Sequence, residues 1–137
     1  MEQIIVLCQA HAEYERSDYD PDQKEEILSR FIFRQNPPLH CLVVEQAEAL
    51  VGYATFMKQF STWDAEYYVY LDCLYLEPQT RGQGIGTQIM EEVKAFARTE
   101  GCSGIQWQTP DFNEKAIRFY QKIGGVHKAK ERFFLEP

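Results

Sequence analysis

The sequence predicts a single mixed α/β domain spanning residues 1–137. Two segments with helical periodicity open the chain, a run of β-type segments follows, and strand-type and helix-type segments then alternate. The length of 137 residues suits one hydrophobic core, and 45% hydrophobic with 26% charged residues is ordinary globular composition. We therefore expect helices packed on a sheet that begins as an antiparallel meander.

The two opening segments are predicted helices. Apolar residues recur with helical spacing from residue 2 to about residue 14. For the second helix, Asp20 is the predicted N-cap and Pro21 fits the first turn. Its apolar face ends before Asn36-Pro37-Pro38, where proline removes backbone donors and fixes φ.

The middle of the chain changes to β-type patterning. Residues 41–44 and 51–60 are predicted strands joined by a short turn around Ala47-Glu48-Ala49. Residues 67–76 are rich in aromatic and β-branched side chains and form the third predicted strand.

The last third alternates helices and strands. A buried apolar stripe predicts a helix from residue 85 to about 98, and residues 105–108 form a short predicted strand. Residues 113–123 are a predicted helix closed by Gly124-Gly125. The tail, residues 126–135, is predicted to hold two short strands.

Composition excludes several classes of function. Lys plus Arg number 14 against 21 Asp plus Glu, and the resulting net charge of −7 argues against nucleic-acid binding. The apolar run at residues 4–8 is too short to cross a bilayer and lacks the flanks of a signal peptide. Four scattered cysteines indicate reduced thiols in a cytoplasmic protein, and three histidines without ligand spacing predict no metal site.

One segment carries clear chemistry, a glycine-rich junction between a predicted strand and a predicted helix. Arg81-Gly82-Gln83-Gly84-Ile85-Gly86 alternates glycines, which permit positive φ and close backbone approach. Exposed amides and the helix dipole there suit a phosphate or pyrophosphate, the alternative being a glycine-rich turn without a ligand. No lysine follows Gly86 as a nucleotide P-loop needs, and Thr87 replaces the third glycine of the dinucleotide fingerprint.

The pattern that remains, Arg/Gln-x-x-Gly-x-Gly/Ala, resembles the acetyl-CoA pyrophosphate loop of the GNAT N-acetyltransferase superfamily. A second match is Asn113-Glu114-Lys115-Ala116-Ile117-Arg118-Phe119-Tyr120 followed by Gly124-Gly125. Ala12-Glu13-Tyr14-Glu15, His40-Cys41-Leu42-Val43, Phe60-Ser61-Thr62-Trp63 and Tyr70-Leu71-Asp72 resemble the diamine (spermidine/spermine and thialysine) acetyltransferase branch. This resemblance implies a GNAT fold, in which a mostly antiparallel sheet splays at the acetyl-CoA site and about four helices flank it.

The resemblance also implies roles for individual residues. Tyr120 would donate a proton to the departing thiolate, and Asp72 would act as base through a water. Leu74 and Leu76 would pair their backbone with the pantetheine arm as an added strand. The implied acetyl-CoA contacts are Leu74, Tyr75, Leu76, Arg81, Gly82, Gln83, Gly84, Ile85, Gly86, Thr87, Asn113, Lys115, Ala116 and Tyr120. The implied acceptor pocket draws on Trp63, Tyr68, Tyr70, Asp72 and Gln108, with Glu13 and Glu15 from the first helix.

These residue types suit amine acetylation. A primary amine with a pKa near 10.4 is only about one part in 2,500 neutral at pH 7, so a carboxylate or ordered water must take its proton. Tyrosine is still protonated at pH 7 and can protonate a thiolate whose pKa is near 8.5. Asp72 has the alternative of a strand-edge carboxylate, Tyr120 that of core packing, and Trp63 with the tyrosines that of covering one sheet face.

The function we expect is an acetyl-CoA-dependent N-acetyltransferase without a metal, acting on a small cationic polyamine- or lysine-like amine by direct attack in a ternary complex. The alternatives are a protein or peptide amine as acceptor, or a non-catalytic CoA-binding regulatory domain. Cys73 stands where the polyamine branch carries an aspartate. Members of the family usually begin with a strand before the first helix, and we expect that strand to be missing here or supplied otherwise. The resemblance also implies a homodimer.

Overall fold

The computed structural model describes all residues, 1–137. The chain forms helices α1 (Glu2–Tyr14) and α2 (Lys24–Ile32), then strands β1 (His40–Gln46), β2 (Ala49–Ser61) and β3 (Glu66–Leu76). A short 3-10 helix, η1 (Pro78–Thr80), leads to α3 (Ile85–Thr99), β4 (Ile105–Trp107) and α4 (Glu114–Lys122). This mixed α/β order confirms the predicted fold class, and none of the helices is both long and apolar enough to span a bilayer.

The sheet has the order β1-β2-β3-β4, with the first three strands antiparallel and β4 parallel to β3. Alternate side chains of the strands point to opposite faces, and a different helix covers each face. On one face, Ile89, Met90 and Val93 of α3 pack against Ala54 and other buried strand residues. On the other, Leu7 of α1 packs against Tyr53 and Tyr75.

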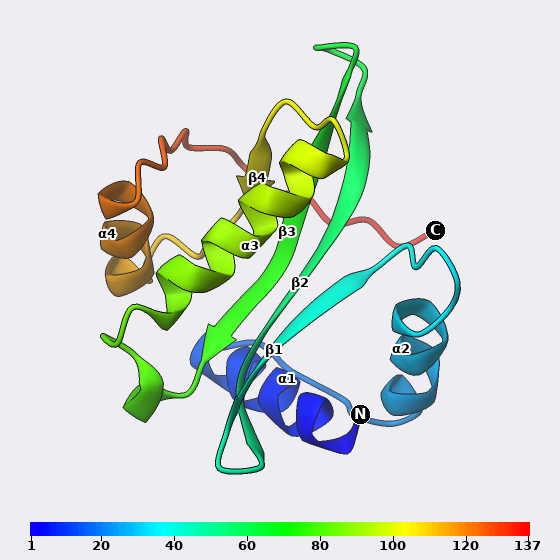
Figure 1. Cartoon of the computed structure of the whole chain (residues 1–137), viewed down its shortest axis with the longest axis vertical. Coiled ribbons are helices and arrows are strands. Elements are labelled where there is room, and N and C mark those ends of the chain that lie inside the picture. The colour runs from blue at the N-terminus through cyan, green and yellow to red at the C-terminus, as the bar shows by residue number, and fades with distance from the viewer.

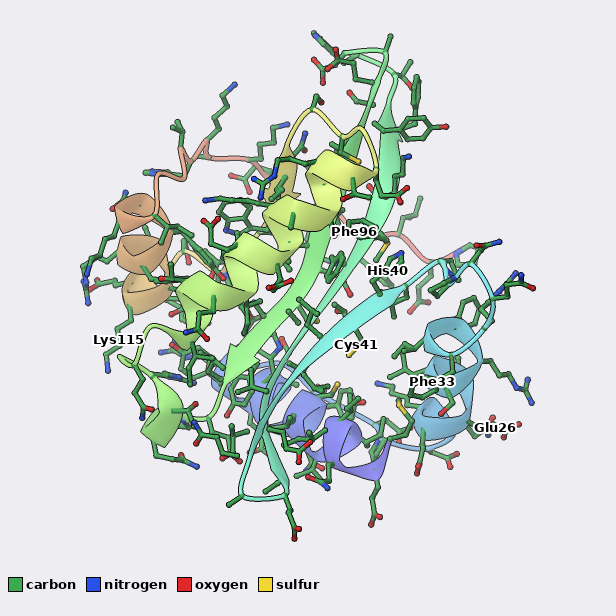
Figure 2. The ribbon with its side chains drawn as sticks, in the orientation of Figure 1. Glu26, Phe33, His40, Cys41, Phe96 and Lys115 are labelled. Carbon is green, nitrogen blue, oxygen red and sulfur yellow. The ribbon has the colours of Figure 1, made fainter.

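In Figure 1, α3 crosses the sheet diagonally and α4 lies to the left of α3. Helix α2 lies at the opposite side of the molecule, beyond β1. Figure 2 shows His40 of β1 beside Phe96 of α3, with ring centroids 4.4 Å apart. This aromatic contact, extended by stacking of His40 on Phe56 at 5.5 Å, anchors the end of α3 that is remote from the glycine loop.

The predicted start of the second helix and the predicted strands of the tail were wrong. Helix α2 begins at Lys24 and not at Asp20, because the Asp20 carboxylate accepts from the Asp22 amide in a local turn and Gln23 takes a left-handed φ of 58°. The tail, residues 126–135, forms no strand. Its apolar side chains Phe133, Phe134 and Leu135 are 91%, 88% and 91% exposed. An alternating pattern makes a strand only where another strand offers backbone partners.

The loop of the β1–β2 hairpin places two non-glycine residues in an unfavourable backbone conformation. Gln46 pairs with Ala49, so Ala47 and Glu48 form a two-residue loop, and both have positive φ, 48° and 66°. Such loops favour Asn-Gly, since other L-residues resist this region. We expect the double substitution Ala47→Asn with Glu48→Gly to raise the free energy of unfolding by about 1 kcal/mol, read from urea denaturation. The control Ala49→Gly, in β2, should lower it; an unchanged or lowered value for the double variant would contradict the assigned turn.

Candidate active site

The site begins where β3 and β4 part. Their parallel pairing covers only Val69, Tyr70 and Leu71, opposite Ile105 to Trp107. Strand β3 then continues to Leu76, paired with β2 on one side and with no strand on the other. The splay that the resemblance implied between these strands is therefore present, and it leaves free backbone along the second half of β3.

A β-bulge at Asp72 marks the start of this opening. Thr55 and Phe56 of β2 are adjacent but pair with Cys73 and Leu71, so Asp72 is an extra residue in β3. The extra residue reverses the alternation: Leu71 faces α3 before the bulge, and Leu74 faces the same cluster after it. The Asp72 side chain is exposed and lines the cavity described below.

The glycine loop presents a row of unused donors. The six backbone amides from Gly82 to Thr87 donate to no carbonyl or side chain of the protein. Gly84, the N-cap of α3, has φ +80° and no side chain to cap the helix, and an added Cβ there would meet nothing within 4 Å. These open amides at the positive end of a 15-residue helix form a site suited to an anion.

A cavity of about 800 Å³ joins this loop to the opening beside β3. It takes walls from α1, β3, the loop, α3 and α4. Of the residues expected at the site, those that line it are Asp72, Leu74, Tyr75, Leu76, Arg81, Gly82, Gly84, Gly86, Thr87, Gln108, Asn113, Lys115, Ala116 and Tyr120, together with Glu15.

Charge is unevenly distributed around the cavity, with most cations on the α3–α4 side, although Glu91 adds a carboxylate there and Arg81 lies against β3 and α1. The α3 and α4 walls carry Lys94, Lys115, Arg118 and Lys122. Lys94 pairs with Glu91 at 2.7 Å and Arg118 with Glu114 at 3.4 Å, while Lys115 and Lys122 have no ion-pair partner in the protein. Figure 2 shows Lys115 at the base of α4, on the side of the loop that leads into α3. The α1 and β3 walls instead carry the carboxylates of Glu15 and Asp72.

Tyr120 lies on α4 and lines the same cavity. Its ring packs on Trp107 and Phe119, with centroids 5.1 and 5.3 Å away. Burial raises its pKa to about 12, and the nearby Glu15 carboxylate and Tyr14 add to the shift. Tyr120 therefore keeps its proton at every pH at which an enzyme normally works, so it can act there as a proton donor and not as a base.

This shift gives a titration prediction. Because the folded-state pKa lies above the ordinary value of 10.0, the protonated hydroxyl favours folding below pH 10, and that contribution is lost as the pH rises toward about 12. Burial also raises the pKa of Tyr19 to about 12, so the readout is the difference between the wild type and Tyr120→Phe. We expect the tyrosinate absorbance lost in Tyr120→Phe to be that of one tyrosine ionising near pH 12. Ionisation of that tyrosine near or below pH 10 would contradict its burial.

Asn113, the N-cap residue of α4, links α4 to α1 beside the cavity. The Asn113 side-chain oxygen accepts from the Tyr14 hydroxyl at 2.8 Å and from the Ala116 amide at 3.3 Å, so it caps α4 and ties α4 to α1. The Arg81 guanidinium lies over the Tyr14 ring, 4.6 Å from its centroid, and its Nε donates to the Leu76 carbonyl at 2.8 Å. Arg81 thereby fixes the glycine loop to β3 and α1.

The structure leaves several expected residues outside the cavity. Trp63 is 96% exposed in the β2–β3 turn, and Glu13 is exposed and bonded to Gln9 at 3.3 Å. Tyr70 is half-buried but does not line the cavity, and Tyr68 bonds to Gln59 at 2.7 Å. The side chain of Gln83 turns back to the Gln79 carbonyl at 3.1 Å, and Ile85 packs against the core under α3.

Sequence reasoning missed His11 as a lining residue and gave Tyr14 no role. The available signal was helical spacing, since His11 precedes Glu15 by one turn of a correctly predicted helix. Which face of that helix meets the cavity depends on its packing against Tyr53 and Tyr75, which are distant in sequence.

A loop with free amides, the splay of β3 and β4, and the protonated Tyr120 on α4 meet at one cavity, an arrangement that suits transfer of an acyl group from CoA. The sequence profile of the acetyltransferase (GNAT) family matches residues 5–125. The chain belongs to the GNAT acetyltransferase family and is an N-acetyltransferase, which confirms the resemblance seen in its motifs.

Relatives and solved structures agree with this assignment. A thialysine N-epsilon-acetyltransferase of Mus musculus is 38% identical over 129 residues, covering 88% of this chain and 75% of that protein. A thialysine N-epsilon-acetyltransferase of Caenorhabditis elegans is 27% identical and covers 94% of this chain and 79% of that protein. An aminoglycoside N-acetyltransferase solved in complex with CoA superposes with a TM-score of 0.80 at 15% identity, covering 98% of this chain and 87% of that one, and shows the shared fold.

Proposed function

We propose that this enzyme binds acetyl-CoA in the cavity and transfers its acetyl group to the primary amine of a small lysine-like substrate. The observation that carries the proposal is the order of chemistry along one cavity: free amides and cations at the α3–α4 end, Tyr120 within it, and two carboxylates at the α1–β3 end. The relatives named for thialysine acetylation support an acceptor of the lysine type.

The residues present fit acetyl-CoA. The amides from Gly82 to Thr87 suit its pyrophosphate, and Lys115 with Lys122 can neutralise further phosphate charge. The Leu76 carbonyl already accepts a hydrogen bond from Arg81. The backbone of Leu74, two residues earlier, has the same orientation and remains free to pair with the pantetheine arm. Asn113 lines the cavity, but its side-chain oxygen already accepts two hydrogen bonds.

Two groups of the chain would move protons. Asp72, exposed on the bulge, takes the ammonium proton through a water, because a carboxylate in the cavity favours a nearby cation and can accept from it. Tyr120 Oη gives its proton to the sulfur that leaves as the acetyl group is transferred. The thioester supplies the acetyl group, and amine and thioester meet directly, so no covalent acyl-enzyme is needed.

The test is a comparison of kcat/KM for thialysine, lysine, ornithine, spermidine, an aminoglycoside and a lysine-containing peptide, with both substrates varied. We expect the lysine-like amino acids to rank first and the initial-rate plots to intersect, as direct transfer requires. Parallel plots would exclude the ternary complex. Preference for the peptide would move the acceptor to a protein lysine, and equal rates on all amines would remove the specific pocket.

A cytoplasmic location and a homodimer remain predictions of the sequence. Size-exclusion chromatography with light scattering tests the dimer.

A further inference from the structure

His11 is a buried titratable group in the cavity that the proposed chemistry does not use. Its side chain is only 12% exposed, and its ring stacks on Tyr75 with centroids 5.3 Å apart. Nδ1 lies 3.0 Å from the Tyr53 hydroxyl, and Nε2 lies 3.2 Å from Oε1 of Glu15. Both ring nitrogens therefore have defined partners, Tyr53 from β2 and Glu15, the C-cap residue of α1.

The partners determine which nitrogen carries the hydrogen. Burial strongly raises the pKa of Tyr53, so its hydroxyl keeps its proton and can donate to Nδ1. The Glu15 carboxylate can only accept, so Nε2 carries the hydrogen and donates to it. This arrangement holds the Glu15 side chain, which is 33% exposed, toward the cavity that also contains Tyr120 and Asp72.

Burial, and not the surrounding charges, keeps the His11 ring neutral at pH 7. Burial lowers its pKa most, and the Arg81 guanidinium lowers it further, while Glu15 and Asp72 act in the opposite direction. Tyr53 and Tyr75, from β2 and β3, face the ring without charge. A neutral imidazole leaves the negative charges of Glu15 and Asp72 available to a substrate cation, whereas a protonated one would offset them and repel it.

We propose that His11 is a positioning residue for the acceptor amine: its Nε2–H holds the Glu15 carboxylate in the cavity as an anchor for the ammonium group, and it does so productively only while the ring is neutral. The proposal rests on the proposed function in that the acceptor is an amine. It assigns to α1 the recognition of substrate charge, separately from the proton transfers at Asp72 and Tyr120.

The test measures kcat and KM for thialysine between pH about 5 and pH about 8 in the wild type, His11→Gln and His11→Leu. Glutamine keeps an N–H donor for Glu15 but cannot titrate, so KM at pH 7 should stay within about threefold of the wild-type value. Toward acid pH, KM should rise less in His11→Gln than in the wild type, because only the wild-type ring becomes protonated. Leucine removes the donor, so KM should rise about tenfold with a smaller change in kcat. An unchanged KM in His11→Leu, or an undiminished acid rise in His11→Gln, would overturn the proposal.

Two further measurements separate this proposal from the proposed function. Calorimetric binding of acetyl-CoA to His11→Leu should match the wild type, which shows that the variant is folded. Imidazole NMR signals of His11 should shift when thialysine is added without acetyl-CoA, and Glu15→Gln should lower the His11 pKa because the carboxylate raises it. If the wild type acetylates no amine, the proposed function fails, and these NMR signals still decide the role of His11: no response to thialysine overturns it.

Discussion

Replacing Tyr120 by phenylalanine should lower kcat by about a hundredfold or more while acetyl-CoA binding stays nearly unchanged. The substitution removes only the hydroxyl, so the packing of the ring on Trp107 and Phe119 is retained. The loss falls on turnover because the hydroxyl is needed only as the thiolate departs. The same raised pKa that keeps Tyr120 protonated makes it a weaker acid than free tyrosine, so its contribution depends on its position against the sulfur.

Steady-state thiol release and calorimetry measure the two quantities. Tyr67→Phe is the matched control, since Tyr67 is half-exposed on β3 and lies outside the cavity, and its activity should equal that of the wild type. If Tyr120→Phe turned over as fast as the wild type, another group or solvent would protonate the leaving sulfur.

Replacing Gly84 by leucine should weaken acetyl-CoA binding by about a hundredfold or more. In the free protein an added Cβ at Gly84 meets nothing within 4 Å, so the side chain would fill the space before the free amides and not disturb the core. Losing two charge-assisted hydrogen bonds, each of about 1.5 kcal/mol or more, accounts for an effect of this size. Calorimetric titration with acetyl-CoA measures it.

Gly101→Leu controls for backbone strain. Gly101 also has a positive φ, +64°, with nothing within 4 Å of an added Cβ, and it lies outside the cavity. Both substitutions should cost about 1–2 kcal/mol of stability, but only Gly84→Leu should affect binding. Equal affinity in Gly84→Leu and the wild type would place the pyrophosphate elsewhere.

Local patterns predicted most of the fold. The helical periodicity placed α1 at Glu2–Tyr14, and the glycine junction placed the start of α3 at Ile85, as observed. The start of α2 was wrong because Asp20 and Pro21 form a separate turn, in which the Asp20 side chain binds the Asp22 amide at 3.0 Å instead of capping the helix. The predicted tail strands were wrong because strand formation needs a neighbour that the sequence pattern does not specify.

Site residues in contiguous motifs were also predicted better than those that depend on distant contacts. Contiguous motifs, the glycine loop and the segment from Asn113 to Tyr120, lie together at the cavity. Of the β3 residues, Asp72, Leu74, Tyr75 and Leu76 line the cavity as expected, whereas Tyr70 does not, because the bulge at Asp72 reverses the alternation of the strand. Nothing local in the sequence marks that bulge. His11 was missed for a related reason, since its partner Tyr53 is 42 residues away in sequence.

The most direct test of the account is the release of free thiol from acetyl-CoA by the wild-type enzyme with thialysine, followed together with formation of the N-acetylated product. The account predicts thiol and product in equal amounts, no release without the amine, and a rate about a hundredfold lower in Tyr120→Phe. Thiol release that is independent of the amine, or binding of acetyl-CoA with no acetylated product, would contradict transfer to a lysine-like amine in this cavity.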